Sequence, residues 1–517
     1  MTSPQCRRRP PRVAGGVLCL ALLWHAPAAA APIRGLTGGA RVAAAYDAIL
    51  AGRFDEWPSI AAVTCPPAPA TACQVLELAA LWWQIQVDYE SRRHDAAFVA
   101  KANSAVAATE AWTTREPERA EAWFYRGAAY GARAQWRVLR GERLAAARDG
   151  KRIKDALERA LALDPTMHDA WFGIGLYHYY AAVAPTAAKI LRVLLLLPGG
   201  DQKQGMAEML RARKDGALLH GEIDYQLHVL DLWYEKDPRH ALSLLEGLRK
   251  QYQMNPHFTQ TIAEVQDTYL HDIPASLQTW QELADAARAG RVRQSAMALT
   301  FARLGAALQL DRLFETDAAI IQLRAVIASA PAAPAGAMAR ARLQLGDALS
   351  RMGQQAEAEA EYRAVIAARP EIGTLAVRAR DGLRSRPLGA QTTAYRVSLQ
   401  GWRALERGDL TTAAPLITQS VALRPDDPVF RYREARLLLA KRDDDRAAAS
   451  LARVLGARPE LAPAIYAAAC VEFAALAERQ GDRTRAIDYY RKAEGVFGAD
   501  TRTIADAKRA RAQLQSR

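Results

Sequence analysis

Apolar residues recur at helical spacing through residues 339–372, in two stretches separated by a glycine. The spacing predicts two antiparallel helices, with the turn at Gly353 and the end of the second helix at Pro370. The apolar positions that define the facing sides are Leu345, Leu349, Ala358, Tyr362 and Val365. One such hairpin cannot bury its own apolar face, so the pattern also predicts neighbouring helix pairs that stack against it.

Similar hairpins follow along the rest of the chain, and no period of two typical of strands competes with them. Pro425 and Pro459 close successive units 34 residues apart, which is the period of a helix–turn–helix repeat. The hairpin that ends at Pro165 is longer, with its turn expected near Gly141. Asp201, followed three residues later by Gln204, predicts a capped helix start.

These positions carry a resemblance to the tetratricopeptide repeat family. The residues that carry it are Arg342, Leu345, Gly346, Leu349, Gly353, Ala358, Tyr362 and Pro370. The resemblance implies an all-α fold, namely a TPR-type α-solenoid in which antiparallel helix pairs form a right-handed superhelix. A second resemblance, over residues 172–210, is to the tetratricopeptide repeat protein 39 family, through Phe172-Gly-Ile-Gly175, Pro185, Gly200-Asp201 and Gly205. It implies shared architecture only.

In the tetratricopeptide repeat family, the first helix of each repeat lines a groove that binds peptides or partner proteins. Transferred to this chain, the resemblance implies that three helices supply the groove. Its candidate residues are Arg340, Leu343, Asp347, Ser350, Tyr395, Ser398, Trp402, Leu405, Val429, Tyr432, Arg436 and Leu439. Family members that clamp a terminal carboxylate need Lys and Asn where this chain has Leu343 and Asp347, so that activity is not implied.

The two halves of the chain differ in composition. Apart from Trp24, every Trp lies at or before Trp280 except Trp402. We therefore predict an irregular, aromatic-rich helical array over residues 31–290. A regular repeat array with a basic C-terminal capping helix should follow over residues 291–517.

The N-terminus has the pattern of a secretory signal peptide over residues 1–30. Arginines in residues 7–12 precede an apolar run at 13–24, and small residues then offer a cleavage site ending at Ala28 or Ala30. No later stretch reaches about eighteen consecutive apolar residues. We expect a periplasmic or otherwise exported protein without a transmembrane helix in the mature chain.

A Pro-rich loop is bracketed by Cys65 and Cys73. An oxidising compartment favours a disulfide across it, which would contribute about 2–3 kcal/mol on the chain-entropy model. The alternative is a pair of unpaired loop thiols.

The net charge of +13 does not indicate a nucleic-acid partner, because the arginines are scattered among glutamates at helical spacing without a basic block. Seven of the nine His lie between His168 and His271, but their spacing matches no metal motif. No nucleophile–base motif or phosphate loop is present either. We expect no enzyme activity, no cofactor and no metal.

Two functions are compatible with the sequence. The first is an exported scaffold or adaptor that binds a protein or peptide partner at the bacterial cell envelope. The alternative is a helical protein that encloses a small apolar or lipid ligand in its N-terminal half, with peripheral membrane contact through the apolar run 189–197. The residues expected to contact such a ligand are Phe172, Tyr177, Tyr179 and Tyr180.

Overall fold

The computed structural model describes residues 35–184, 199–369, 372–385, 387 and 389–516, and every regular element in these ranges is helical. The all-α prediction is therefore confirmed. The expected signal peptide and the apolar run 189–197 lie outside the described residues.

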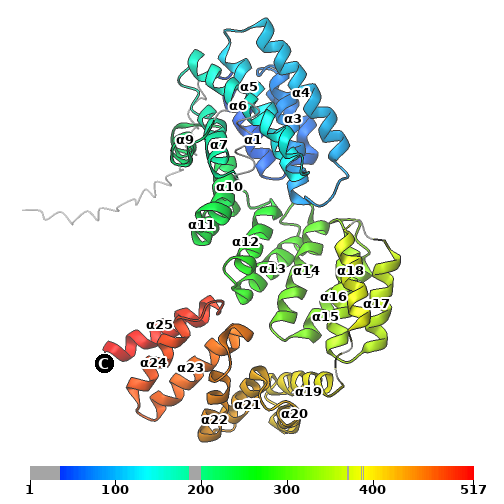
Figure 1. Ribbon diagram of the computed structural model, residues 1–517, viewed down its shortest axis with the longest axis vertical. Coiled ribbons are helices and arrows are strands. Elements are labelled where there is room, and N and C mark those ends of the chain that lie inside the picture. Colours follow the sequence, from blue (N-terminus) through cyan, green and yellow to red (C-terminus); the bar gives the residue numbers. More distant parts are fainter. Residues whose placement is uncertain (1–34, 185–198, 370–371, 386, 388, 517) are drawn as a thin grey trace, which may run out of the picture.

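Helices follow one another with short connections along the whole described chain (Figure 1). Up to the middle of the chain they are α1 (Gly39–Leu50), α2 (Trp57–Thr64), α3 (Ala70–Val87), α4 (Asp95–Arg115), α5 (Ala120–Leu139), α6 (Arg143–Leu163), α7 (Ala170–Val183), α9 (Gln202–Asp215), α10 (His220–Leu230), α11 (Pro238–Gln251) and α12 (Pro256–Thr268). The remaining ones are α13 (Ile273–Arg288), α14 (Ser295–Arg312), α15 (Thr316–Ser329), α16 (Ala337–Arg351), α17 (Gln355–Ala367), α18 (Gly373–Arg384), α19 (Gly389–Glu406), α20 (Leu410–Leu423), α21 (Pro428–Ala440), α22 (Asp444–Leu455), α23 (Pro463–Arg479), α24 (Arg483–Glu494) and α25 (Thr501–Ser516).

The pair α16–α17 shows why the repeat sequence folds as it does. Gly346 faces Tyr362, and a Cβ added at Gly346 would lie 2.6 Å from the Tyr362 ring, so glycine lets the two helices approach closely. Gly353 adopts φ 79° in the turn between them, a conformation that glycine adopts without strain. Ala358, Tyr362 and Val365 are buried as predicted.

The predicted helix starts and turns in the irregular part are also confirmed. Gly141 lies between α5 and α6 with φ 82°. The carboxylate of Asp201 accepts a hydrogen bond from the backbone N–H of Gln204 at 2.8 Å and caps α9.

The helices form an inner and an outer layer in the second half of the chain. Apart from α18 and α19, each helix packs against the next one along the sequence, and α14 also contacts both α12 and α16. The same alternate contacts join α19, α21, α23 and α25. The first helices of successive pairs therefore form a continuous inner layer.

The largest hydrophobic cluster lies in the N-terminal half and joins α1, α3, α4 and α5 to α10, α11 and α12. Trp83 and Phe258 are fully buried there, and the ring of Trp83 packs edge-on against Tyr225 with centroids 4.8 Å apart. Glu222 is buried in the same region and accepts hydrogen bonds from Tyr46 at 2.8 Å and from Trp83 at 3.0 Å.

The loop between α2 and α3 is closed by the Cys65–Cys73 disulfide, whose Cα atoms are 6.3 Å apart. The predicted bridge is therefore present. Hydrophobic packing continues across residue 290, because one cluster contains both Trp280 and Ala302. The division of the chain into two arrays at that point stays a prediction.

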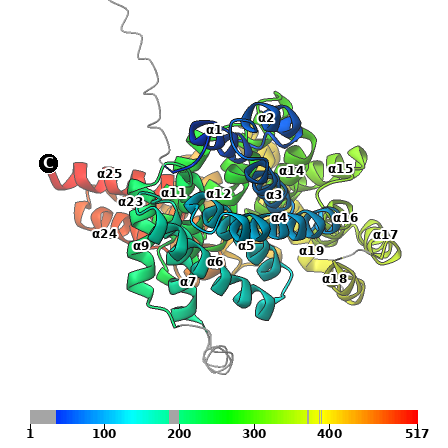
Figure 2. The ribbon, with the colours of Figure 1, turned by 90° about the horizontal axis from the view of Figure 1, so that it is seen from above.

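The chain bends so that its C-terminal helices approach its middle (Figures 1 and 2). Asp272, just before α13, accepts a hydrogen bond from the backbone N–H of Thr501 at 3.1 Å. His271 and Phe497 are in ring contact beside it, with centroids 5.0 Å apart. Among the described helices, none combines the length and the apolar character needed to cross a bilayer.

Candidate binding pocket

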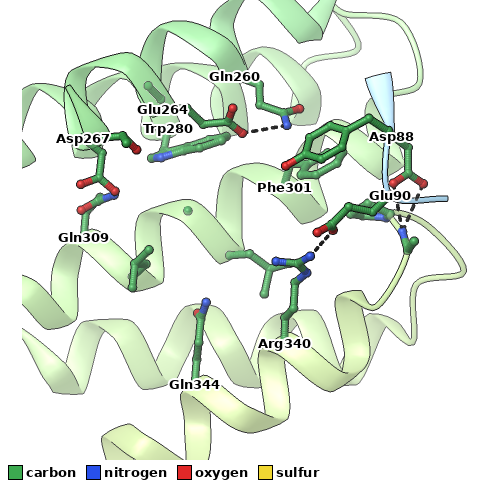
Figure 3. A pocket seen from close by; sticks show the side chains of 18 residues that line it. Asp88, Glu90, Gln260, Glu264, Asp267, Trp280, Phe301, Gln309, Arg340 and Gln344 are labelled. Atoms are coloured by element: carbon green, nitrogen blue, oxygen red, sulfur yellow. Dashed lines mark hydrogen bonds and ion pairs between the residues drawn. The ribbon is translucent and has the colours of Figure 1, made fainter. Parts of the chain in front are cut away.

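A cavity of about 200 Å³ lies on the inner layer, between α12, α14 and α16 (Figure 3). The turn after α3, which contains Asp88, Tyr89 and Glu90, borders it on one side. Pro334 and Ala335, in the connection that leads to α16, complete the border. The cavity therefore joins segments that are about 250 residues apart in sequence.

Aromatic rings form part of the wall. Trp280 of α13 is 5% exposed and lies against Gly305 of α14, where there is no room for a Cβ atom. Glycine at 305 thus allows the indole ring to lie directly against the α14 backbone. Phe301 of α14 presents a further ring to the same cavity (Figure 3). Tyr89, which is 46% exposed, also lines it.

Glu264 of α12 has its carboxyl group in the cavity. The amide Nε2 of Gln260, one turn earlier, donates a hydrogen bond to it at 3.0 Å. Water reaches the Glu264 side chain through the cavity, yet the surrounding protein displaces much of its hydration, and this desolvation raises the pKa of the carboxyl group.

Asp88 is a second desolvated carboxylate, 6% exposed, at the C-terminal end of α3. It accepts a hydrogen bond from the backbone N–H of Ala335 at 3.1 Å, which ties the α3 turn to the connection before α16. Burial raises the pKa of Asp88 even though the Ala335 hydrogen bond opposes this effect.

The other two acidic groups of the cavity already face basic partners. Glu90 forms an ion pair with Arg340 of α16 (Figure 3). Asp267 pairs with Arg312 and accepts a hydrogen bond from Nε2 of Gln309 at 2.8 Å.

Gln344 of α16 points toward the cavity opposite Glu264 (Figure 3). Its amide oxygen is buried and has no hydrogen-bond partner among the described residues. A ligand that donates a hydrogen bond would satisfy it. Taken together, the cavity combines carboxylates, aromatic faces and an amide, which is a lining suited to binding a positively charged group.

The sequence-predicted groove residue Arg340 lies in this cavity. Asp347, two turns further along α16, instead accepts a hydrogen bond from the Tyr362 hydroxyl at 2.8 Å and pairs with Arg378 at 3.3 Å. Its carboxyl pKa is raised by desolvation.

Leu343 and Ser350, the other groove candidates on α16, are buried, and the remaining candidates lie on α19 and α21, away from the cavity. Tyr395 and Tyr432 are buried, and the hydroxyl of Tyr395 lies 2.7 Å from that of Thr316. Trp402 is partly buried beneath the guanidinium of Arg433, 5.7 Å from the ring centroid. Arg436 pairs with Glu472 at 3.3 Å. Their part in a partner groove stays a prediction.

The four residues proposed to contact an apolar ligand all lie on α7. Phe172 and Tyr179 are buried, and the Tyr179 hydroxyl donates a hydrogen bond to Glu235 at 2.5 Å. Tyr180 is 38% exposed and contacts Tyr234 with ring centroids 5.9 Å apart, whereas Tyr177 is partly buried and contacts His178. The apolar run expected to complete that site lies outside the described residues.

The sequence did not lead us to Glu264, Asp88 or Trp280 as site residues. A signal was present on α12, where Gln260, Glu264 and Asp267 follow helical spacing and share one face. No comparable signal places the turn at Asp88 beside them, because that contact depends on how the whole array bends.

Comparison with known proteins identifies two segments of the chain. Residues 339–372 and residues 404–471 each match a family model described as tetratricopeptide repeat. The chain contains tetratricopeptide repeats. The first of these segments includes Arg340 and Gln344 of the cavity. Neither match reaches residues 172–210, so the resemblance of that region to the tetratricopeptide repeat protein 39 family stays a prediction.

Two of the solved structures with detectable similarity are described as a tetratricopeptide repeat protein and a TPR domain. A tetratricopeptide repeat protein from Parabacteroides merdae ATCC 43184 is 16% identical, with a TM-score of 0.25, over 57% of this chain and 99% of that one. The P58(IPK) TPR domain is 13% identical, with a TM-score of 0.23, over 74% of this chain and 98% of that one. The APC/C hetero-tetramer Cut9-Hcn1 is 12% identical, with a TM-score of 0.25, over 93% of this chain and 84% of that one. No curated protein matches the chain, and these likenesses say nothing about its function.

Proposed function

We propose that this protein is an exported scaffold that binds a segment of a protein partner against its inner helical layer, at the bacterial cell envelope. Tetratricopeptide repeat proteins generally serve as scaffolds for protein–protein interaction, and stacked repeats use the surface of their inner helices for binding. The observation that carries the proposal is the cavity formed by α12, α14 and α16, because it opens on that layer of helices.

Two features support export. Residues 1–30 have the composition of a signal peptide. The Cys65–Cys73 disulfide is of the kind that persists in oxidising compartments and is rare in the cytosol.

Site-specific photo-crosslinking in the native host tests the binding surface. A photoreactive residue replaces Leu308, which borders the cavity and is 41% exposed. The matched control replaces Ile321 of α15, which is 66% exposed and belongs to the outer layer. We expect a discrete adduct from position 308 only. Equal labelling at both positions, or no adduct at either, would contradict the proposal.

Osmotic-shock fractionation tests export in the same cells. The mature chain should be released with the periplasmic proteins and begin near residue 31 by N-terminal sequencing. Recovery of the full-length chain in the cytosolic fraction would rule export out.

The alternative, an enclosed apolar or lipid ligand, has less support. Phe172 and Tyr179 already pack in a protein cluster with Met209 and Leu227. Native mass spectrometry of purified protein distinguishes the two functions, because only the alternative predicts a co-purifying lipid.

A further inference from the structure

We propose that the cavity between α12, α14 and α16 binds a cationic side chain, the ammonium of a lysine or the guanidinium of an arginine. The proposed function supplies the source of that side chain, an extended segment of the protein partner.

The charge of the cavity is opposite to that of the protein. The chain carries a net charge of +13, yet four carboxylates line the cavity against a single arginine. They are Asp88, Glu90, Glu264 and Asp267, with Arg340 as the basic residue. A local negative field in a basic protein attracts cations to this point of its surface and disfavours anions.

Pairing within the protein leaves two of these carboxylates without a cation. Glu90 is paired with Arg340, and Asp267 with Arg312. Glu264 and Asp88 receive hydrogen bonds only from neutral donors, the amide of Gln260 and the backbone of Ala335. Among the described residues neither forms an ion pair, so a bound cation would complete their coordination.

The walls fit the stem and head of a basic side chain. Trp280, Phe301 and Tyr89 contribute aromatic rings to the lining, and aromatic rings attract ammonium and guanidinium groups and pack against their methylene chains. The amide of Gln344 stands opposite Glu264, and rotation about its last side-chain bond would let its unpartnered oxygen accept a hydrogen bond from the ligand.

The size and the ligand set favour an organic cation. The cavity, about 200 Å³, is much larger than one water needs but smaller than the roughly 300–1,000 Å³ of pockets for drug-sized ligands and cofactors. Within the described part of the chain, no three His, Cys, Asp or Glu residues are grouped closely enough to hold a metal ion. A single side chain is therefore the best-fitting occupant.

Saturation-transfer NMR and calorimetric titration of the full mature chain test the inference. The probes are Nα-acetyl-lysine amide, Nα-acetyl-arginine amide and the neutral Nα-acetyl-norleucine amide, with putrescine as a free diamine. We expect saturable binding of one or both cationic amides and at least about tenfold weaker binding of the norleucine amide.

The decisive variant is Glu264→Gln, which removes one charge and keeps the shape. Glu264 is exposed to solvent through the cavity, and a Gln there can still accept the hydrogen bond from Gln260, so the variant should fold as well as the wild type. The matched control is Glu357→Gln on α17, whose carboxylate pairs with Arg324 of α15. Affinity for the cationic amides should fall about tenfold in Glu264→Gln and stay unchanged in Glu357→Gln.

The outcomes separate this inference from the proposed function. Equal binding of the cationic and neutral amides, or unchanged affinity in Glu264→Gln, overturns the cation site even where crosslinking at position 308 still captures a partner. If putrescine binds at least about tenfold more tightly than the lysine amide, the claim that the cation comes from a peptide side chain is overturned. If the cationic amides bind as expected but position 308 forms no crosslink, the cation site is supported and the scaffold function is overturned.

Discussion

Asp272 accepts hydrogen bonds from both the backbone N–H and the hydroxyl of Thr501, which lies 229 residues later in the chain. Asp272 also caps α13 by accepting a hydrogen bond from the backbone N–H of Ala275 at 3.1 Å. One carboxylate therefore fixes the start of α13 and holds the start of α25 against it. Contacts of this kind, between repeats far apart in the stack, add long-range order to an array in which most contacts are between neighbours.

Replacing Thr501 tests this connection without disturbing the α13 cap. Thr501→Val removes the hydroxyl donor and should weaken the connection by about 1 kcal/mol, the net contribution of a typical hydrogen bond. Hydrogen exchange should become faster in α25 and at the start of α13, with little change in α14. Thr503→Val is the control, because the Thr503 hydroxyl bonds to the nearby Asp500. Equal exchange in both variants would show that the long-range bond contributes nothing.

Asp149 in α6 should be the most sensitive single position in the α5–α6 pair. Its carboxylate is fully buried and accepts hydrogen bonds from Arg133 at 2.9 and 2.8 Å and from Arg137 at 2.5 Å. Asp149→Ala would leave Arg133, itself 9% exposed, without its counter-charge, at a cost of about 3–5 kcal/mol. Urea unfolding followed by circular dichroism measures the loss.

The control for Asp149 lies on the same helix. Asp155 forms an exposed i, i+4 pair with Lys151, and Asp155→Ala should cost no more than about 0.5 kcal/mol. A comparable loss in both variants would mean that burial of the Asp149 network does not set its contribution.

The sequence was sufficient for features that depend on neighbouring residues. Gly346, Gly353 and Tyr362 occupy the places that the repeat pattern assigned to them, because helix spacing and close approach are decided within one hairpin. The turn at Gly141 and the cap at Asp201 were predicted for the same reason.

Features that depend on the bend of the whole array were not predictable in this way. Asp88 lies beside Ala335, and Asp272 beside Thr501. Both placements result from small rotations accumulated over many successive helix pairs. Arg340 was expected to face a groove and does line the cavity, but its partner Glu90 comes from the turn after α3, about 250 residues earlier in the chain. The binding chemistry of the cavity therefore depends on contacts that the repeat pattern does not encode.

Stability should fall on mild acidification because of buried imidazoles. Burial lowers the pKa of His257 to about 4 and that of His228 to about 3, from an ordinary value near 6.5. Below about pH 6.5 the unfolded chain binds protons that the native protein does not, so the free energy of unfolding drops by about 1.4 kcal/mol per pH unit for each histidine. The drop from His257 should level off near pH 4 and that from His228 near pH 3.

Glu222, buried in the same region, acts in the opposite direction. Desolvation raises its pKa, so the native state binds the Glu222 proton first and gains stability as pH falls through that raised value. The contribution of His257 to the pH dependence of the free energy of unfolding is measured by urea unfolding of His257→Gln. His220→Gln is the control, since His220 is exposed on α10. The slope between pH 6.5 and 4 should become shallower only in His257→Gln, and equal slopes in both variants would contradict the assignment.

The thiols should be unreactive in the native protein. Cys65 and Cys73 are paired, and burial raises the pKa of the Cys470 thiol to about 12, which suppresses its thiolate. Alkylation without reductant should therefore label none of the three in the mature chain. After reduction, only Cys65 and Cys73 should be labelled until the protein unfolds. Replacing both by Ser should lower stability by about 2–3 kcal/mol, and rapid labelling of Cys470 in native protein would contradict its burial.

The affinity of the cavity for a cationic side chain should depend on pH through Glu264. The carboxylate attracts a cation and the protonated acid does not, so binding weakens as pH falls through the raised pKa of this group. Asp88, whose pKa burial also raises, adds to the same trend, whereas Glu90 and Asp267 keep their own arginine partners. Titration of Nα-acetyl-lysine amide between pH 8 and pH 5 should show this weakening in the wild type and a shallower profile in Glu264→Gln.

By linkage, the bound cation should lower the pKa of Glu264, so binding in the region of that pKa should release protons. Heats of binding that are the same in buffers of different ionisation enthalpy would show that no proton is released and that Glu264 does not contact the ligand.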